Sequence, residues 1–367
     1  MRVILSGGGT GGHIYPALAV AGALKARSET IEILFVGAHG RMEMEKVPAH
    51  GYQIEALPIA GLRRSLSLSN LKVPFLLAKS LGRAAQIIKK FQPQAVAGFG
   101  GYASAPILRM AQRSGIPTLI QEQNSYAGLT NKWLAKRADI ICTAYDNMDD
   151  YFPVEKIRKT GNPVRQDLKE LQYRHPEALT HFGGTQYKKT VLLFGGSLGA
   201  KTLNEAMRLS TEYIDRQSDV LYLWQTGKSY LDDYTQTSTA ALTNVRIMPF
   251  IRRMDLAYAL SDIVICRAGA LSISELALVE RPAVLVPSPH VAEDHQTHNA
   301  KAMVQKGAAW MIKDADASEL LIPYATERLK DENAMQQMKL RLRAQARPDA
   351  ADEIANCLLS LASAQQA

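Results

Sequence analysis

The stretch Val3-Ile4-Leu5-Ser6-Gly7-Gly8-Gly9-Thr10-Gly11-Gly12-His13 decides the fold. An apolar run that suits a buried strand is followed by five glycines within positions 7–12. Because glycine has no Cβ, such a loop can adopt positive φ and let a ligand approach the backbone closely. A helix is predicted over 15–21, with Pro16 near its first turn. Strand, glycine loop and helix together direct backbone N–H groups and a helix dipole at an anion, commonly a phosphate. His13 adds a group that can move a proton near neutral pH.

Two other interpretations of this loop stay open but are disfavoured. Gly7, Gly9 and Gly12 fit the dinucleotide pattern G-x-G-x-x-G, which also requires an acid at the end of the second strand to bind a ribose. The predicted second strand ends in Gly37-Ala38-His39 without an acid. A nicotinamide or flavin enzyme is therefore disfavoured. A purely structural turn would need fewer glycines.

Composition indicates a soluble globular protein with room for two domains, since the chain has 367 residues, 47% hydrophobic and 21% charged. No signal peptide and no apolar run long enough to span a bilayer are recognised. The three cysteines, Cys142, Cys266 and Cys357, lie far apart and predict a reducing compartment.

The positive charge is concentrated in one segment. The formal net charge is +8, and residues 56–121 contain nine basic residues and no acid. Within this segment, residues 71–90 predict an amphipathic helix with only basic charges, which is typical of a surface that docks on anionic lipid. The alternative is an ordinary core-facing helix with a solvated basic face. Nucleic acid is disfavoured because no aromatic residues are interleaved with the basic ones. The residues predicted to meet the membrane are Lys72, Phe75, Leu76, Lys79 and Arg83.

Apolar runs alternate with helical patterns along the whole chain, which predicts parallel sheets wrapped by helices. The predicted strands are 3–6, 31–36, 54–57, 95–97, 118–120 and 139–143 in the first half, and 190–194, 220–225, 244–248, 262–266, 283–286 and 309–312 in the second. Gly161-Asn162-Pro163 separates the halves, and the polar segment 172–189 is predicted to be a loop.

Two further glycine clusters follow predicted strands. Gly98-Phe99-Gly100-Gly101-Tyr102 adds backbone amides to the first half. Gly195-Gly196-Ser197-Leu198-Gly199-Ala200 opens the second half as residues 6–13 open the first. The second cluster approaches a P-loop, but the glycine required before Lys201 is Ala200, whose Cβ would crowd a phosphate nest. Two Rossmann-like domains are therefore favoured over a P-loop ATPase.

The chain resembles a known family at this point. The matching motifs, in order, are Ser6–His13, Gly98–Tyr102, Glu122-Gln123-Asn124, Gly161-Asn162-Pro163-Val164-Arg165, Gly195–Gly199 and 267–275, Arg-Ala-Gly-Ala-Leu-Ser-Ile-Ser-Glu. They resemble the MurG family, the bacterial N-acetylglucosaminyltransferases of peptidoglycan synthesis. The resemblance implies an α/β fold of the GT-B class, with two Rossmann-like parallel-sheet domains facing a central cleft. The expected domains are 1–163 for the acceptor and membrane, 164–345 for UDP-GlcNAc, and a C-terminal helix in 346–367 that returns to the first domain.

The same resemblance implies an inverting transfer of GlcNAc from UDP-GlcNAc to the C4 hydroxyl of MurNAc in undecaprenyl-pyrophosphoryl-MurNAc-pentapeptide, which converts lipid I to lipid II. The enzyme would act at the cytoplasmic face of the bacterial membrane as a peripheral protein, without a cofactor and without nucleic acid. His13 is the first candidate for the general base and Glu122 the reserve. The residues implied for UDP-GlcNAc are Thr10, Gly11, Gly12, Asn124, Arg165, Ser197, Ile251, Ala270, Glu275 and Gln296. Those implied for the acceptor diphosphate are Gly8, Gly9, Gly100, Gly101 and Tyr102.

Several alternatives remain beside the resemblance. His295 and His298 are three residues apart, a helical spacing that would permit a metal site, and Asp294 and His290 lie nearby in the sequence. No pattern of residues that would support the ligands and no fourth ligand are evident, so a metal site is disfavoured. Asp314-Ala315-Asp316 spells a metal-binding D-x-D, yet it precedes a helical run and is predicted to cap that helix. Other UDP-sugar enzymes of the same architecture, such as a glycolipid transferase or the UDP-GlcNAc 2-epimerase, and a non-catalytic nucleotide-sugar or membrane-binding module are the competing functions.

Overall fold

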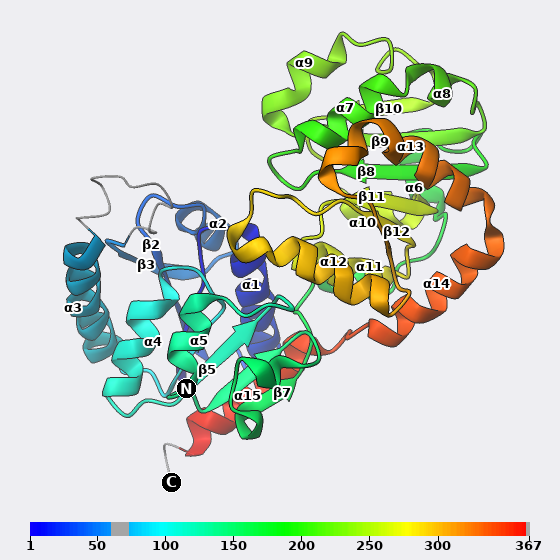
Figure 1. The fold of residues 1–367 in the computed structure, drawn as a ribbon. Helices are drawn as coiled ribbons and strands as arrows, with labels where there is room; N and C mark the ends of the chain where they lie inside the picture. The colour runs from blue at the N-terminus through cyan, green and yellow to red at the C-terminus, as the bar shows by residue number, and fades with distance from the viewer. Residues whose placement is uncertain (60–72, 365–367) are drawn as a thin grey trace. The chain divides into compact units, whose positions relative to one another are not determined.

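The computed structural model describes residues 1–59 and 73–364. The chain divides into two compact units, Met1–Arg165 with Arg347–Ala367, and Gln166–Ala346. Each unit holds one sheet of parallel strands, most of which are labelled in Figure 1. Lys72, one of the residues predicted to meet a membrane, lies outside the described residues.

The sheet of the first unit has seven strands in the order β3-β2-β1-β4-β5-β6-β7, all parallel. They are β1 (Arg2–Ser6), β2 (Glu32–Ala38), β3 (Gln53–Leu57), β4 (Ala95–Gly98), β5 (Thr118–Glu122), β6 (Ile140–Thr143) and β7 (Ile157–Lys159). The six strands predicted for this half are confirmed to within a few residues. The short edge strand β7 was not predicted, because Ile157-Arg158-Lys159 carries no buried apolar run.

Helices cover this sheet, and the last helix of the chain is one of them. They are α1 (Gly11–Arg27), α2 (Glu43–Ala49), α3 (Val73–Phe91), α4 (Ser104–Arg113), α5 (Leu129–Ala135) and α15 (Ala350–Ala364). Leu24 of α1 and Leu358 of α15 are buried in one core with alternate residues of the central strands. Arg27 donates to Asp352 over 2.9 Å. Helices α1 and α15 therefore pack side by side (Figure 1).

Helix α1 begins earlier than the sequence predicted. Thr10 has extended backbone angles and precedes the helix, and its carbonyl accepts from the N–H groups of His13 and Ile14. Gly11, Gly12 and His13 thus form the first turn of α1, whereas the prediction placed them in the loop. Pro16 lies inside the helix and not in its first turn. The first N–H groups of a helix have no partner within it, so this start is suited to an anionic ligand.

The second unit has six parallel strands in the order β10-β9-β8-β11-β12-β13. The strands are β8 (Lys189–Phe194), β9 (Val220–Gln225), β10 (Val245–Met248), β11 (Ile263–Cys266), β12 (Ala283–Leu285) and β13 (Trp310–Met311), and the helices include α7 (Lys201–Leu209), α8 (Thr211–Asp215), α9 (Leu231–Thr235), α10 (Met254–Leu260), α11 (Ala270–Val279), α12 (His295–Gln305), α13 (Asp314–Lys330) and α14 (Glu332–Gln345). All six strands predicted for this half are confirmed.

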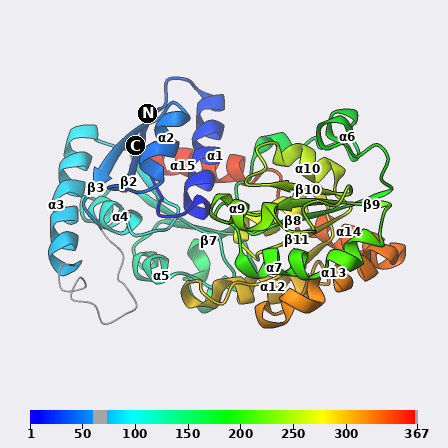
Figure 2. The same cartoon turned by 90° about the horizontal axis from the view of Figure 1, so that it is seen from above.

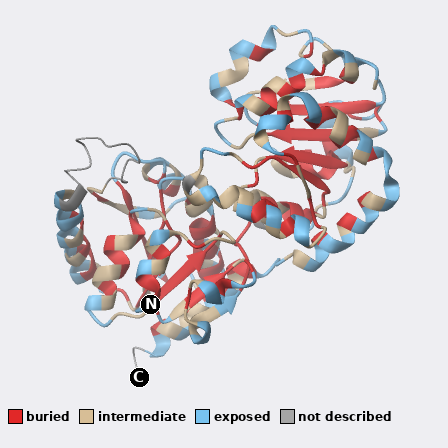
Figure 3. Ribbon diagram, viewed as in Figure 1, coloured by how far each residue is buried: buried red, intermediate tan, exposed pale blue. Residues whose placement is uncertain are grey.

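Both faces of the second sheet are buried, as parallel sheets require. Val191 and Leu193 of β8 pack in one core with α7 and α13. Leu192 and Phe194 pack in the other core with α10, α11, α12 and α14. The continuous apolar run of β8 is explained by this two-sided burial, and the strands of both sheets are largely buried in Figure 3. In Figure 2, α7 and α13 lie together beside this sheet.

The segment 172–189 is not the loop that its polar composition predicted. It contains α6 (Pro176–Phe182). The ring of His175 accepts from the N–H of Glu177 at the start, and Gly183 at φ +63° ends the helix. Ala178 and Phe182, four residues apart, are buried against α10. Cap, proline, spacing and glycine were all visible in the sequence, but the helix is too short for its periodicity to stand out.

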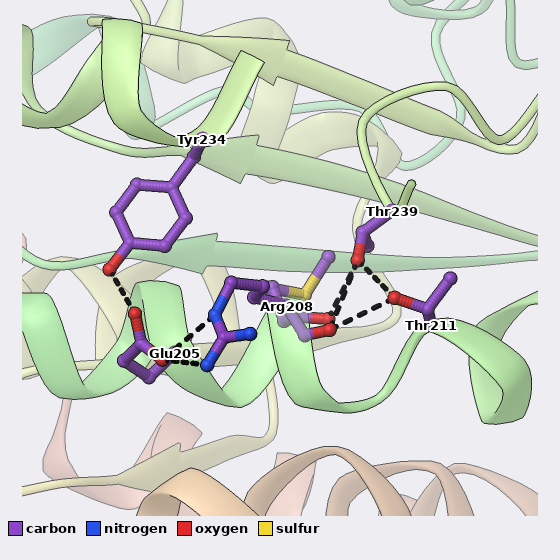
Figure 4. Close-up of polar contacts among 6 residues, drawn as sticks. Glu205, Arg208, Thr211, Tyr234 and Thr239 are labelled. Atoms are coloured by element: carbon purple, nitrogen blue, oxygen red, sulfur yellow. Dashed lines mark hydrogen bonds and ion pairs between the residues drawn. The ribbon is translucent and has the colours of Figure 1, made fainter. Parts of the chain in front are cut away.

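A polar network fixes the end of α7 (Figure 4). The hydroxyl of Tyr234 on α9 donates to Glu205 over 2.6 Å, and Arg208 donates to the same carboxylate. The hydrogen bond from Arg208 holds the pKa of Glu205 below its usual value. Burial, and then Glu205, raise the pKa of Tyr234. Thr211 and Thr239 donate to the last carbonyls of the helix. The network ties α7 to α9, and none of its contacts involves the glycine loop 195–199.

Candidate functional site

Each unit has its strand order reversed at one central strand. In the first unit β1 pairs with both β2 and β4, and in the second unit β8 pairs with both β9 and β11. Ligands of open α/β sheets bind beyond the carboxyl ends of the strands at this point. The glycine loops that follow β1 and β8 both lie there. The sequence thus places its two most glycine-rich loops where each sheet offers a binding crevice.

In the first unit, the glycine loop is built around the carboxylate of Glu43, the first residue of α2. Glu43 is fully buried. It accepts from the N–H of Gly9 over 2.9 Å and from the N–H of Ala38 over 2.9 Å. A Cβ at Gly8 would lie 2.1 Å from Glu43 Oε1, and one at Gly37 would lie 2.5 Å from its Cγ. These two glycines therefore make room for an internal carboxylate.

His13 faces the same loop from the first turn of α1. Its Nδ1 lies 2.9 Å from the carbonyl oxygen of Gly8 and 3.3 Å from the hydroxyl of Thr10. The ring lies against Gly100, where a Cβ would be 2.8 Å from Cδ2 and 3.0 Å from Nε2. The imidazole is half-buried. The predicted base is thus held by the backbone of two glycine loops.

The cluster 98–102 packs directly on the first glycine loop. Gly100 and Gly101 have φ of +90° and +81°, and a Cβ at Gly101 would lie 2.3 Å from the carbonyl oxygen of Gly8. Positive φ favours glycine at both positions, and the close approach to Gly8 leaves no room for a Cβ at Gly101. The ring of Tyr102 is 54% exposed. Gly8 and Gly9 are two of the five residues predicted to hold the acceptor diphosphate. The peptide between them already makes internal contacts, its carbonyl with His13 and its N–H with Glu43.

Glu122, the predicted reserve base, ends β5 and is buried. Its carboxylate accepts from the N–H groups of Asn124 and Gly128 and from the side-chain amides of Asn124 and Asn131. Four donors occupy its oxygens. This carboxylate holds the segment that carries Asn124 in place. A general base needs a lone pair that is not already used, so the four donors make Glu122 less suited to that role.

The segment 161–165 is placed by buried amides and by the end of the chain. Gly161 has φ +87°, and a Cβ there would lie 2.5 Å from the Cβ of Arg347. Asn162 accepts from Gln121 and donates to the carbonyl of Gln123. Arg165, two residues after Pro163, is half-buried.

In the second unit, Gln225 joins the loops that follow the two strands on either side of its own strand. It ends β9, between β8 and β10, and is 2% exposed. Its Nε2 donates to the carbonyl of Gly196 over 3.0 Å, and its Oε1 accepts from the N–H of Ile251 over 2.8 Å. Ser197 is exposed at the tip of the glycine loop. Gln225 thereby fixes both Ile251 and the loop that carries Ser197.

Glu275 lies on α11, whose first residue is Ala270. The hydroxyl of Tyr258, a fully buried residue of α10, donates to Glu275 Oε2 over 2.9 Å. Gln296 lies in the first turn of α12, and its Oε1 accepts from the N–H of Ser288 over 2.9 Å. Both predicted ligand residues are therefore held by hydrogen bonds within the second unit.

Asp314 and Asp316 lie in the first turn of α13, where capping was predicted. That prediction is wrong, because the residue before the helix is Lys313 and no side chain caps it. Asp314 instead accepts from Thr202 and forms an ion pair with Arg267. Within residues 1–59 and 73–364, no group of three or more His, Cys, Asp or Glu side chains is placed to hold a metal ion.

Three supporting residues were missed by sequence reasoning, namely Glu43, Gln225 and Tyr258. None lies in a glycine loop or in a motif that the resemblance used. The sequence offers only weak signals for two of them. Gln225 is a polar residue at the end of an apolar strand, and Glu43 is an acid at the start of a short helix. Only the fold reveals what they contact.

Helix α3 carries the predicted membrane residues that the structure describes. Phe75 is 73% exposed, Leu76 is half-buried, and Lys79 and Arg83 are exposed. Arg83 forms an ion pair with Glu55 over 2.8 Å. The opposite side of the helix is buried through Ala84, Ile87 and Ile88. No helix among the described residues has the length and apolar character needed to cross a bilayer.

Comparison with known proteins identifies the family. Residues 3–143 match the glycosyltransferase family 28 N-terminal domain, and residues 190–354 match the glycosyltransferase family 28 C-terminal domain. The chain belongs to glycosyltransferase family 28. Within family 28 it is 50% identical over 365 residues to the UDP-N-acetylglucosamine–N-acetylmuramyl-(pentapeptide) pyrophosphoryl-undecaprenol N-acetylglucosamine transferase of Parabacteroides distasonis, covering 98% of each chain. The protein of that name from Bacteroides fragilis (strain ATCC 25285) is 49% identical over 364 residues, covering 99% of this chain and 96% of the relative.

Solved structures agree with this placement in family 28. The crystal structure of Acinetobacter baumannii MurG superposes with a TM-score of 0.77 at 30% identity, over 98% of this chain and 99% of that one. The UDP-GlcNAc 2-epimerase of Neisseria meningitidis reaches a TM-score of 0.69 at 15% identity, over 98% and 100% of the two chains, a likeness of fold alone. The predicted MurG family membership and GT-B fold are confirmed.

Proposed function

We propose that this protein transfers GlcNAc from UDP-GlcNAc to the C4 hydroxyl of the MurNAc in undecaprenyl-pyrophosphoryl-MurNAc-pentapeptide, converting lipid I to lipid II with inversion at the anomeric carbon. The observation that carries the proposal is the near full-length similarity, at about half identity, to proteins named for that transfer. The candidate site is consistent with it, because both units present a glycine loop at their switch point. This reaction is the last cytoplasmic step of peptidoglycan precursor synthesis.

The second unit binds the UDP moiety in this proposal. Ser197 and the neighbouring amides of its loop contact the diphosphate, and the backbone of Ile251 contacts the uracil. Glu275 accepts from the ribose hydroxyls, and Gln296 contacts the sugar. Ala270, at the start of α11, lies where a helix dipole favours an anion, so the departing UDP is stabilised without a metal.

In this proposal the first unit binds the acceptor and also contributes contacts to UDP-GlcNAc. Thr10, Gly11 and Gly12, with Asn124 and Arg165, contact UDP-GlcNAc. Among the glycines assigned to the acceptor diphosphate, Gly100 and Gly101 are favoured over Gly9, because the N–H of Gly9 already donates to Glu43. Tyr102 lies beside them with an exposed ring.

His13 accepts the proton of the attacking hydroxyl. A general base must keep a lone pair within hydrogen-bond reach of that proton. Glu122 meets this requirement less well, because four donors occupy its carboxylate. The donor set of Glu122 therefore assigns it to positioning Asn124.

The acceptor lipid requires the enzyme to reach a membrane. We assign this contact to Phe75, Lys79 and Arg83, which are exposed on α3, and to the half-buried Leu76, together with Lys72. A peripheral position on the cytoplasmic face of the bacterial membrane follows from that assignment and from the chemistry of the acceptor.

The proposal is tested by incubating the protein with labelled UDP-GlcNAc and a short-chain lipid I analogue. We expect label to move to the analogue, and not to diacylglycerol or water, with UDP as the second product. His13→Ala should lower kcat by about 100-fold or more, within the range typical of a general base. Asp139→Asn is the control and should keep full turnover, because Asp139 precedes β6 and accepts from the N–H of Thr118, at the opposite end of β5 from Glu122.

Each alternative gives a different result in this assay. Transfer to diacylglycerol would identify a glycolipid transferase, and conversion of UDP-GlcNAc to its 2-epimer without transfer to an acceptor would identify an epimerase. Binding of UDP-GlcNAc without turnover would identify a binding module. Near-full turnover of His13→Ala at saturating substrates would remove the base assignment and leave the transfer itself intact.

A further inference from the structure

One peptide group connects a buried carboxylate to the candidate base. The N–H of Gly9 and the carbonyl of Gly8 are the two ends of the same peptide bond. Glu43 Oε2 lies 2.9 Å from that nitrogen, and His13 Nδ1 lies 2.9 Å from that oxygen. The three groups therefore form a continuous chain of hydrogen bonds from carboxylate to peptide to imidazole.

The direction of each hydrogen bond in this chain is fixed by chemistry. A carbonyl oxygen only accepts, so the hydrogen between Gly8 and His13 must be on Nδ1. A neutral imidazole carries one ring hydrogen, and Nε2 is then the nitrogen with the lone pair. At the other end, an ionised carboxylate also only accepts, so Glu43 requires the peptide N–H to point toward it.

We propose that Glu43 is a positioning residue that sets the tautomer of His13 through the Gly8–Gly9 peptide, so that Nε2 is the nitrogen able to take the proton of the attacking hydroxyl. This inference rests on the assignment of His13 as the base. In a Ser-His-Asp triad a carboxylate contacts the imidazole directly and selects its tautomer. Here the same selection passes through one peptide unit.

The need for such a device follows from the glycines themselves. A peptide between two glycines has no Cβ on either side, so it can flip at little steric cost. The flipped peptide would present its N–H to His13, and Nδ1 would have to accept. The ring hydrogen would then be on Nε2, and that nitrogen could not accept a proton. Glu43 opposes the flip because its oxygens cannot donate to the carbonyl that would face them.

Glu43 is itself held in place. Its second oxygen accepts from the N–H of Ala38 at the end of β2, and the carboxylate fills the space that Gly8 and Gly37 leave open. On its other side the Gly8 peptide meets Gly101, which stands where any Cβ would overlap the carbonyl oxygen. Strand, helix and two glycine loops thus leave this peptide one orientation.

The arrangement also favours the protonated ring that forms in the reaction. When Nε2 takes the proton, Nδ1–H still donates to the Gly8 carbonyl. A carbonyl whose own N–H is bound to a carboxylate is a stronger acceptor, because hydrogen bonds in a chain polarise one another. Imidazolium is therefore stabilised without any carboxylate in contact with the substrate.

The first test reads the tautomer of His13 in the wild-type protein. The protein is labelled with ¹⁵N-histidine, and the ring nitrogens of His13 are assigned by comparison with His13→Gln. At a pH where the ring is neutral, we expect Nδ1 to show the signal of a protonated nitrogen and Nε2 that of an unprotonated one. The opposite pattern in the wild-type protein would overturn the proposal, whatever the enzyme's activity.

The second test is Glu43→Gln, which keeps the shape of the side chain and adds a donor. The new amide can donate to a flipped carbonyl, so the Nε2–H tautomer of His13 should appear. We expect kcat to fall at least 10-fold while the Kd for UDP-GlcNAc stays within about 3-fold. Asp262→Asn is the matched control, because Asp262 is another buried carboxylate that accepts a backbone N–H, from Thr190 in the second unit.

The control should lower stability without changing the His13 signals or kcat. Glu43→Gln with wild-type kcat and an unchanged tautomer would contradict the proposal. A changed tautomer with unchanged kcat would keep the positioning role and remove His13 as the base. Failure of wild-type protein to transfer GlcNAc would instead refute the proposed function, and the histidine spectrum would still report on Glu43.

Discussion

At the scale of single residues, the candidate site depends on side chains that hold other protein groups in place. Tyr258 is the clearest case in the second unit. Its buried hydroxyl donates to Glu275, the residue proposed to accept from the ribose. A hydrogen bond to a charged group typically contributes about 1.5–3 kcal/mol. Part of that stabilisation holds Glu275 in one orientation.

We predict that Tyr258→Phe weakens binding of UDP by about 3- to 10-fold, because Glu275 then loses a hydrogen bond that orients it toward the proposed ribose contact. Binding of the analogue of UDP that lacks both ribose hydroxyls should change less than 2-fold. Isothermal titration calorimetry measures both values. Tyr222→Phe is the matched control, since the hydroxyl of Tyr222 is buried and has no hydrogen-bond partner among the residues that the structure describes.

Equal losses for the two nucleotides in Tyr258→Phe would show that the hydroxyl acts on the whole unit and not on the ribose contact.

The residue scale is also where prediction from the sequence was least complete. The glycines of residues 7–12 were recognised, but as a cradle for phosphate. The structure shows that Gly8 accommodates Glu43 and that Gly101 accommodates Gly8. A single sequence does not reveal which internal group approaches a glycine.

At the scale of elements, α3 combines a core-facing side with a basic and apolar exposed side. The buried side fits the interpretation of a core-facing helix, whereas docking of the exposed side on lipid stays a prediction. Ile87 and Ile88 pack in the unit, while Phe75, Lys79 and Arg83 face outward. Basic residues near an anionic surface contribute about 1 kcal/mol each.

We predict that the double variant Lys79→Glu, Arg83→Glu binds vesicles containing anionic lipid at least about 30-fold more weakly, because two attractive contributions of about 1 kcal/mol become repulsive. Vesicle co-sedimentation at fixed ionic strength measures the loss. Lys188→Glu, Arg216→Glu changes the net charge equally on exposed positions of the second unit and serves as the control. Equal losses in both variants would reduce the effect to net charge, and no loss in either would refute docking by α3.

Element prediction succeeded where burial is strong and failed where it is weak. Buried strands such as β8 and β9 were predicted because their apolar runs are continuous. The edge strand β7 has no such run, and α6 has two buried residues within one short helix. The start of α1 was misplaced because glycines are poor helix formers, and the fold overrides that preference.

At the scale of the whole molecule, the two units have separate cores although the chain visits the first unit twice. The core shared by α1 and α15 contains residues from both ends of the sequence. The second unit has two cores, one on each face of its sheet, built from residues 166–346. This organisation allows a substitution or a ligand to be assigned to one unit by the thermal transition that it moves.

We therefore predict that Leu358→Ala, on the last helix, lowers the unfolding transition of the first unit. Truncating a fully buried leucine costs about 2–5 kcal/mol, which corresponds to about 5–15 °C for a unit of this size. Leu321→Ala, on α13 and equally buried, is the matched variant and should lower the other transition by a similar amount. Differential scanning calorimetry separates the two.

The same two transitions also test which unit binds UDP. A ligand at 100 times its Kd stabilises the unit that binds it by about 2.7 kcal/mol. UDP should raise the transition that Leu321→Ala lowers and leave the one that Leu358→Ala lowers in place, because the proposed contacts to base, ribose and diphosphate all belong to the second unit. If UDP raised only the transition that Leu358→Ala lowers, the nucleotide would be assigned to the first unit. In that case Ser197, Ile251 and Glu275 would lose their proposed roles, whereas the contact of α15 with α1 would stand.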